Sequence, residues 1–401
     1  MDEYLRRLRD GTLKLYALEK ELAPADAVSI RRKFIEEETG VPLDRIGDCT
    51  ISLDAVVKKN CENMIGTIQV PLGVAGPVRI KGEYADGTMY LPLATTEGAL
   101  IASVNRGCSL ITAAGGADVR ILKDGMTRAP VFAADSIVHA KAVCDWIHAH
   151  EGEIRAEAES TTRFGKLTGI EMTTAGTSVF VRLSFVTGDA MGMNMVTIAS
   201  AKAADLISRE TGARLIALSG NWCTDKKPAA VNVVMGRGKT VSAGVLLSQE
   251  LISKVLKTDA ASLLEVNTRK NLVGSARAGS FGFNAHAANI IAAMFIACGQ
   301  DPAHVVEGSL CITTVDPAHE GVYVSVTLPA LPIGTVGGGT SVETQAECLR
   351  MLGVSGSGDP PGSHARKLAE IVASGVLAGE LSLLGALAAQ HLARAHSTLG
   401  R

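Results

Sequence analysis

The chain has 401 residues, enough for two or three domains, and its 47% hydrophobic content supports a large core. Lys and Arg total 39 while Asp and Glu total 41, and no long block carries a single sign of charge. This balance argues against a nucleic-acid partner or a membrane surface and favours a small-molecule substrate.

The cysteines and the N-terminus bear on the compartment. Eight cysteines are scattered without a C-x-x-C pair, and the first residues, MDEYLRRLRDG, lack the apolar core of a secretion signal. We expect a reducing, cytoplasmic setting and no membrane association. Two apolar stretches, 278–300 and 368–393, contain polar or charged side chains, so neither supplies the roughly 20 apolar residues of a membrane span. Both predict buried helices.

The chain divides by pattern into three units. Residues 1–61 predict a small helical unit, with one of its helices ending near Gly40. From residue 62, TMYLPL predicts a strand that leads into a helix over ATTEGALIASVNRG, which Glu97 would open. Residues 62–128 and 219–401 form the expected large domain, in which a long-helix pattern continues from 219 to the C-terminus.

The middle segment, 129–218, has a different character. It predicts a helix over DSIVHAKAVCDWIHAHEG, a strand over TSVFVRLSFVTG, a helix over MVTIASAKAADLISRETG and a strand over ARLIAL. This is a compact α+β unit of about ferredoxin-like size, inserted into the large domain. The fold class expected for the whole chain is α+β.

The stretch SGNWCTDKKPAAVN, 219–232, contains turn-forming residues that exclude a regular helix. Asp225, Lys226 and Lys227 are therefore expected on a loop at a strand end. They form either a solvated turn with a local ion pair, or a site in which a lysine held near the apolar wall around Trp222 stabilises an anion.

Three glycine-containing stretches are candidates for phosphate binding. GDAMGMNMV, 188–196, predicts a helix start with Asp189 as a possible cap, and GTVGGGT, 334–340, permits either close approach of a ligand or a tight turn. GRGKT, 236–240, lacks the first glycine of a P-loop because position 233 is valine, so it predicts a hairpin turn.

Several titratable residues have two interpretations. Glu97 either compensates a helix dipole or donates a proton, and Asp301 either caps the next short helix or takes part in chemistry. His391 and His396 are five residues apart, which does not match the spacing of metal ligands on one helix face. We therefore predict no metal site and expect one of the two to be an acid or base.

Several long strings together resemble one family. In order along residues 60–401 they are ENMIG, PLATTEGALIASVNRG, DGMTRAP, GDAMGMNM, SGNWCTDKKPAAVN, GSFGFNAHAANIIAAMFIACGQD, LPIGTVGGGT and LAGELSLLGALAAQHLARAH. They resemble 3-hydroxy-3-methylglutaryl-CoA (HMG-CoA) reductase. ATTEG and DKKPAA are similar to the class I branch, and the lack of a membrane segment is similar to its soluble archaeal members.

The resemblance implies an architecture and a reaction. The large domain is built about a central helix, and the inserted ferredoxin-like domain binds NADPH without a Rossmann fold. HMG-CoA is reduced to mevalonate by two hydride transfers that consume two NADPH and release CoA. The enzyme is a dimer, commonly a tetramer, in which the lysine-bearing loop crosses to the partner's site.

The resemblance also assigns residues. The catalytic set comprises Glu97, Lys226, Asp301 and His396. The substrate-binding set comprises Arg128, Ser219, Asp225, Lys227, His286 and Asn289. The nucleotide-binding set comprises Thr162, Arg163, Asp189, Met191, Gly192, Met193, Asn194, Gly337, Gly338, Gly339 and Arg401.

The chemistry agrees with these roles. Lys226 would stabilise the alkoxide formed by hydride attack, and His396 would protonate the departing CoA thiolate. Glu97, expected beside Asp301, would supply the proton for the aldehyde. Two alternatives remain open: an ATP-dependent kinase that uses GRGKT, and a catalytically silent scaffold that binds CoA or a nucleotide.

Overall fold

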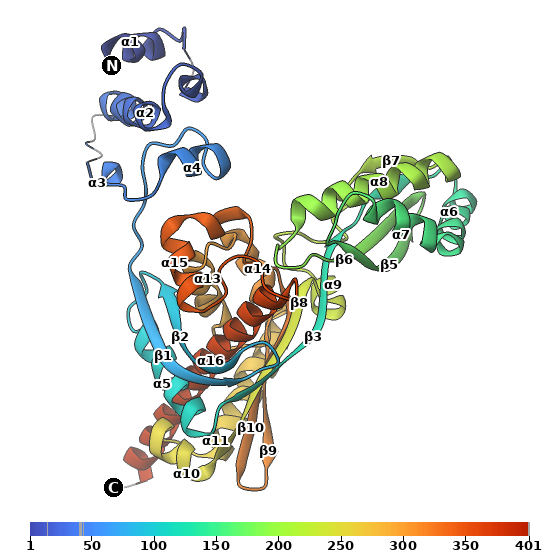
Figure 1. The fold of residues 1–401 in the computed structure, drawn as a ribbon. Helices are drawn as coiled ribbons and strands as arrows, with labels where there is room; N and C mark the ends of the chain where they lie inside the picture. Colours follow the sequence, from blue (N-terminus) through green and yellow to red (C-terminus); the bar gives the residue numbers. More distant parts are fainter. Residues whose placement is uncertain (14, 40–41, 43, 400–401) are drawn as a thin grey trace.

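The computed structural model describes residues 1–13, 15–39, 42 and 44–399, with the side chains of 16, 39, 45 and 390–399 outside that description. The N-terminal unit lies at one end of the molecule (Figure 1). Its helices are α1 (Asp2–Arg9), the 3-10 helix η1 (Leu15–Lys20), α2 (Pro24–Thr39), α3 (Asp44–Gly47) and α4 (Leu53–Lys59). α1, η1 and α2 share a small apolar cluster that includes Leu5, Leu18 and Ile30, and Val56 and Val57 of α4 belong to a second cluster with Val28 of α2. The predicted helix end at Gly40 lies outside the described residues.

The large unit contains a six-stranded array in the order β2-β1-β3-β8-β10-β9. Its strands are β1 (Leu72–Lys81), β2 (Asp86–Ala94), β3 (Ala117–Arg128), β8 (Gly238–Ser248), β9 (Ile312–Ala318) and β10 (Gly321–Leu331). β1 and β3 are parallel, and the other neighbours are antiparallel.

The prediction of continuous long helices after residue 219 was wrong, because β8, β9 and β10 lie in that region. The strand period was present in the sequence: Val322, Val324, Val326 and Leu328 of β10 are buried at every second position.

Helices pack on this sheet and fill the rest of the large unit. They are α5 (Leu100–Ala113), α9 (Ala230–Met235), α10 (Gln249–Leu251), the π-helix η2 (Ile252–Leu256), α11 (Ala260–Val266), the π-helix η3 (Asn267–Gly274), α12 (Ser275–Ala278), α13 (Ala287–Ala297), the 3-10 helix η4 (Pro302–His304), α14 (Val305–Gly308), the 3-10 helix η5 (Gly338–Ser341), α15 (Glu343–Met351) and α16 (Ser363–Leu399). The longest, α16, runs through the unit (Figure 1).

The buried helix predicted over 368–393 is confirmed for its described part. Ser363–Ala389 of α16 is long and apolar enough to cross a membrane, yet 83% of its most apolar window is buried inside the protein.

Two carboxylates, Glu370 and Glu380, lie fully buried within α16. The Glu370 carboxylate accepts three backbone N–H bonds from residues 83–85, and burial raises the pKa of this group. Glu380 accepts two N–H bonds and a hydroxyl bond, so both buried carboxylates have partners.

The middle unit has the order β-α-α-β-β-α-β. Its elements are β4 (Val131–Ala133), α6 (Ile137–Ala149), α7 (Glu151–Glu159), β5 (Lys166–Ala175), β6 (Ser178–Val186), α8 (Met193–Thr211) and β7 (Arg214–Ala217). The antiparallel strand order β7-β4-β6-β5 and this element sequence are those of a ferredoxin-like arrangement. The unit has its own apolar core, and β3 runs into it by pairing with β6. The exact domain boundaries stay predictions.

Candidate active site

The loop 218–229 between β7 and α9 holds a strained backbone. Six described residues other than glycine have a clearly positive φ, and three of them lie in this loop: Asn221 (64°), Thr224 (41°) and Lys226 (57°). Asparagine tolerates this region, but threonine and lysine rarely adopt it. Strain of this kind persists only where surrounding contacts enforce it, and it concentrates at functional sites.

Lys226 and Asp301 form an ion pair. Lys226 Nζ lies 2.7 Å from Asp301 Oδ2, and Asp301 Oδ1 accepts the N–H of Ala303 at 3.0 Å. Asp301 thus caps η4, as one interpretation predicted, and also holds the lysine. The Asp301 carboxylate raises the pKa of the Lys226 ammonium. Burial alone would raise the pKa of Asp301, but the bonds from Lys226 and Ala303 outweigh it and leave that pKa below its ordinary value. Lys226 is therefore a cation at neutral pH.

Asp225 points to the other side of the loop. Its Oδ1 accepts from His304 Nε2 at 2.9 Å and lies 3.1 Å from Arg237 Nη2, while Arg128 Nη1 lies 3.9 Å from Oδ2. The hydrogen bond from His304 leads the causes that lower the pKa of Asp225 to about 2, against the opposing effect of burial. Asp225 is consequently an anion held by internal contacts, and these contacts fix the loop directly before Lys226.

GRGKT is not a hairpin turn, contrary to the prediction. Residues from Gly238 onward form β8, which pairs with β3 and β10. Arg237 is fully buried and holds Asp225, while the buried Lys239 lies 3.2 Å from Asp124. Both cations of this motif serve internal ion pairs, which removes the phosphate-binding role on which a kinase would depend.

Glu97 lies in a second cluster. Its Oε2 accepts from Asn289 Nδ2 at 2.8 Å. The prediction that Glu97 opens a helix was wrong, because α5 begins at Leu100 and Ala99 adopts a left-handed φ of 67° at its N-cap. The nearby His286 ring donates from Nε2 to the carbonyl of Gly379, 2.8 Å away, which ties it to α16. Glu97 is exposed, as an acid that must reach a ligand has to be.

The two clusters lie at opposite ends of α13. Asn289 is in its first turn, and Asp301 follows its last residue, Ala297. The eight residues from Asn289 to Ala297 span about 12 Å at the α-helical rise. Within one chain, the cluster of Glu97 and Asn289 is thus separated from Asp301 by the length of α13, and the contact between Glu97 and Asp301 stays a prediction.

A cavity of about 630 Å³ brings together segments that are far apart in the sequence. It is lined by residues 59–60, 190–195, 299–302, 334 and 336–340. The loops at 190 and 336 are joined by a parallel bridge between Ala190 and Val336. Gly299 and Gly339 pack backbone to backbone, since a Cβ on Gly299 would come within 2.4 Å of the Gly339 carbonyl oxygen. Seven of the residues predicted to bind the nucleotide, 191–194 and 337–339, line this cavity together with Asp301.

The cavity wall offers positive charge from the backbone and from one lysine. Helix α8 begins in the wall at Met193, and its N-cap, Gly192, has a left-handed φ of 94° and no side chain that caps the helix. A helix N-terminus without a capping side chain attracts anions. Lys59, the last residue of α4, lines the same cavity. Asn60 donates to the Gly338 carbonyl at 3.0 Å, which ties the N-terminal unit to the glycine loop.

Comparison with known proteins identifies the family. The family profile for hydroxymethylglutaryl-coenzyme A reductase matches residues 27–401. The reductase of Methanothermobacter thermautotrophicus is 55% identical over 98% of both chains, and that of Methanocaldococcus jannaschii is 53% identical over 100% of this chain and 99% of its own. The chain belongs to the HMG-CoA reductase family.

This chain shares its fold with a solved structure. It is the class II HMG-CoA reductase from Streptococcus pneumoniae bound to NADPH in open conformations, with a TM-score of 0.67 and 20% identity. The match covers 89% of this chain and 86% of the other.

Not every residue that the family resemblance implied faces the cavity. The Asp189 carboxylate accepts the N–H groups of Gly358 (3.0 Å), Gly362 (2.7 Å) and Ala365 (3.0 Å), around the start of α16. Burial would raise the pKa of Asp189, but these bonds outweigh it and lower it. Asp189 caps α16 instead of its own helix, and its backbone carbonyl, bonded to Thr335 N–H at 2.7 Å, holds the glycine loop.

The remaining residues that the family resemblance implied are not among those that line the cavity. Thr162 Oγ1 accepts from Gly165 N–H at 3.0 Å and contacts Met195 Sδ, at 3.2 Å, on the cavity wall. Arg163 beside it is exposed. Ser219 Oγ lies 3.3 Å from Cys223 Sγ, and Lys227 Nζ donates to the Asp225 carbonyl at 3.3 Å. The His396 side chain and Arg401 lie outside the described residues.

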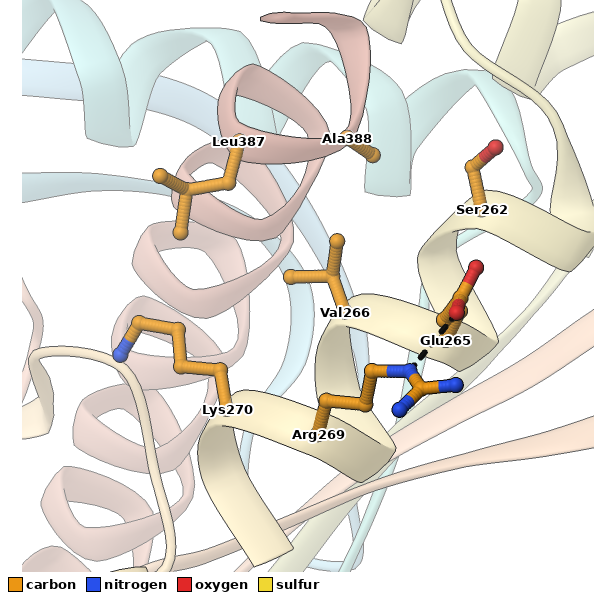
Figure 2. Close-up of a pocket in the computed structure, with 7 residues that line it drawn as sticks. All are labelled: Ser262, Glu265, Val266, Arg269, Lys270, Leu387 and Ala388. Atoms are coloured by element: carbon orange, nitrogen blue, oxygen red, sulfur yellow. Dashed lines mark hydrogen bonds and ion pairs between the residues drawn. The ribbon is translucent and has the colours of Figure 1, made fainter. Parts of the chain in front are cut away.

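A smaller cavity of about 330 Å³ lies between η3 and α16. Figure 2 shows Arg269 paired with Glu265, whereas the Lys270 side chain extends away from this pair, on the side of Leu387 of α16. Arg269 Nε and Glu265 Oε1 lie 2.7 Å apart. His396 follows nine residues after Leu387, about 14 Å further along the helix. Lys270 is not among the predicted site residues, and it lies in the polar segment NTRKNLVG.

Other contributors were also missed. Lys59 belongs to the unit that was expected to be separate from the site. His304 and Glu307 follow Asp301 closely, and Arg237 belongs to the rejected P-loop motif. A fully buried arginine requires carboxylate partners. A prediction that Arg237 is buried would therefore have indicated carboxylates beside it.

Proposed function

We propose that this protein reduces (S)-HMG-CoA to (R)-mevalonate and CoA with two NADPH, in isoprenoid biosynthesis. The observation that carries the proposal is the cavity of about 630 Å³, in which the glycine loops, the start of α8 and Asp301 meet. A site for an anionic dinucleotide thus adjoins a carboxylate that holds a lysine ammonium at 2.7 Å. We assign the protein to class I on its ATTEG and DKKPAA sequences, and the archaeal relatives support an archaeal-type enzyme.

The cavity suits NADPH in size and charge. Binding sites for small ligands measure about 300–1,000 Å³. The N–H groups of Met193 and Asn194 would hold phosphate at the start of α8, and Gly337–Gly339 would allow the dinucleotide to approach the backbone. Arg163 and Arg401 are the proposed partners of the 2′-phosphate. The ferredoxin-like unit at 129–218 is therefore the nucleotide-binding domain.

Bound NADPH supplies the hydride, and the protein stabilises the charge that results. Lys226 would hold the alkoxide oxygen after attack on the thioester carbonyl and again after attack on the aldehyde. Asp301 keeps Lys226 protonated and directed into the site. Arg128, Ser219, Lys227, His286 and Asn289 would bind the HMG group, with Asp225 fixing the loop.

Two protons complete the reaction. Collapse of the first adduct expels CoA as a thiolate, which His396 would protonate so that the sulfur cannot add back to the aldehyde. Glu97 would give the second proton to the mevaldehyde oxygen as mevalonate forms. Both hydrides and both protons are then accounted for.

We further propose that each site is shared by two protomers in a dimer or tetramer. One substrate carbonyl cannot touch both Glu97 and Lys226 if α13 separates them by about 12 Å. Glu97 and Asn289 of one protomer would face Lys226 and Asp301 of its partner. The proposed location is the cytoplasm, on the scattered free cysteines.

One assay tests the function. Purified protein should oxidise NADPH when HMG-CoA is added, with two NADPH consumed and one free thiol released per mevalonate. Absence of oxidation with both NADPH and NADH would refute the proposal. Consumption of ATP without oxidation of NADPH would instead revive the kinase alternative.

A further inference from the structure

The side chain and the backbone of Lys226 are both held by one short segment, residues 301–307. Its ammonium pairs with Asp301, and its backbone N–H donates to Glu307 Oε1 at 2.9 Å. Glu307 lies on α14, and its side chain is fully buried. The residue that presents the candidate catalytic ammonium is thus fixed at its main chain by a carboxylate that no substrate can reach.

The hydrogen bond from the Lys226 N–H to Glu307 opposes the strain in the Lys226 backbone. Lys226 has a φ of 57°, in the left-handed region where a Cβ crowds the backbone. An N–H bond to an ionised carboxylate is shorter and stronger than one to a neutral acceptor. Glu307 therefore supplies a contact strong enough to keep Lys226 in a conformation that lysine avoids.

Arg237 and His304 complete the cluster. Arg237 is fully buried and donates to Glu307 Oε1 at 2.7 Å and to Asp225 Oδ1 at 3.1 Å. His304, 1% exposed, bonds Asp225 Oδ1 at 2.9 Å. The Arg237 guanidinium thereby links Asp225 to Glu307, which bonds the Lys226 backbone, and its charge balances the buried Glu307 and the half-buried Asp225.

Stability alone does not account for Glu307. Its Oε2 is buried and has no hydrogen-bond partner among the described residues. A buried polar atom without a partner is destabilising, and such an atom is often retained where function requires the group.

We propose that Glu307 is a positioning residue, which, with Arg237 and His304, holds Lys226 in its left-handed conformation and directs its ammonium to Asp301. This inference rests on the proposed reductase activity. It adds to that activity a buried support behind the reactive lysine.

A bound cation is the competing explanation for the cluster. One ligand atom each of Asp225, His304 and Glu307 lies within 4.8 Å of the others, a spacing that could hold a metal ion. The Arg237 guanidinium already bonds Glu307 Oε1 and Asp225 Oδ1, so a cation would have to displace it. If a chelator abolished wild-type activity and a divalent ion restored it, a metal ion and not Arg237 would hold these carboxylates, and the proposal would be overturned.

The test compares two substitutions of similar length. Glu307→Gln keeps an oxygen that can accept the Lys226 N–H, whereas Glu307→Met keeps the volume without an acceptor. Both remove one of the two carboxylates that Arg237 faces, so both should lower the unfolding temperature. We expect Glu307→Met to lower kcat about 10²-fold, the scale of loss when a distant change misplaces a reacting group. Glu307→Gln should stay within several-fold of wild type, and the KM values should change little.

The control is Glu370→Met, which removes another fully buried carboxylate that accepts backbone N–H bonds. It should lower the unfolding temperature but leave kcat per folded protein unchanged. A readout independent of activity is acetylation of Lys226, followed by mass spectrometry, which should be faster in Glu307→Met than in Glu307→Gln. Equal kcat and equal labelling in the two Glu307 variants would overturn the proposal, whereas an inactive wild type would refute the reductase function instead.

Discussion

Lys226 and Asp301 form a 2.7 Å ion pair although their side chains remain 44% and 34% exposed. A pair this accessible to water contributes little to stability, typically 0–1 kcal/mol. Its members come from a strained loop and from the N-cap of η4, and Asp301 lines the cavity of about 630 Å³. The pair therefore has the features of a reactive site more than of a structural brace.

The first prediction concerns Lys226 itself. Lys226→Ala removes the cation proposed to stabilise the alkoxide, so kcat for NADPH oxidation should fall by about 10²–10³-fold. Because the lost ion pair is exposed, the unfolding temperature should change by no more than a degree or two, on the order of 0–1 kcal/mol. Steady-state kinetics and thermal unfolding of the same preparation check both parts. Activity above about a tenth of wild type in a folded variant would contradict the role.

Local patterns in the sequence predicted four elements of the middle unit, α6, β6, α8 and β7, but not β4, α7 or β5. The alternating Val179, Val181, Leu183 and Phe185 indicated β6, and all four side chains are buried in it. A strand with one face in the core carries its period in its own residues, so no distant information is needed.

The same reasoning failed where structure depends on distant partners. β8 pairs with β3 and β10, which are far from it in sequence, and its glycine and serine residues weaken the strand signal. Asp189 was assigned to its own helix, but its carboxylate bonds the start of α16, more than 160 residues away. A single sequence does not indicate which of several helix starts a given carboxylate will cap.

For the candidate site, the sequence supplied the reactive residues but not their support. Lys226 and Asp301 lie in recognisable strings, and their contact is a finding of the structure. Glu307 and Lys59 lie in segments whose side chains have ordinary alternative roles, namely a short helix and a helix end. Their positions relative to the site follow from packing, which local sequence does not specify.

The second prediction concerns Lys59. Among the residues that line the cavity it is the one cation, and NADPH carries several phosphate charges. Lys59→Ala should raise the KM for NADPH by about 3- to 10-fold, more at low than at high salt, with little change in kcat. Lys58→Ala is the matched control, because Lys58 has the same charge in the same last turn of α4 but does not line the cavity. An equal effect of both substitutions would mean that only the general charge of the helix end matters.

The third prediction tests the shared site. If Glu97 and Lys226 act in one site from different protomers, two inactive variants should complement each other. Co-expression of Glu97→Gln with Lys226→Ala in equal amounts and random assembly should restore about a quarter of wild-type activity, since that fraction of sites receives both intact residues. Each variant alone gives the baseline. Activity of the mixture no higher than this baseline would place both residues in sites formed by a single chain.

The last prediction concerns acid stability. The hydrogen bond from His304, with Arg237 nearby, lowers the pKa of Asp225 to about 2 from an ordinary value of 3.8. A carboxylate whose pKa is depressed in the folded state stabilises the fold above its ordinary pKa, and this stabilisation is lost as pH falls from about 4 to about 2. It amounts to on the order of 2 kcal/mol. Asp225→Asn lacks the titration, so the difference between its free energy of unfolding and that of wild type should be constant above about pH 4 and shrink below it. Urea unfolding of both proteins, at each pH where both remain folded, measures that difference. A difference that stays constant or widens as the pH falls from 4 would show that the Asp225 carboxylate is not held by these contacts.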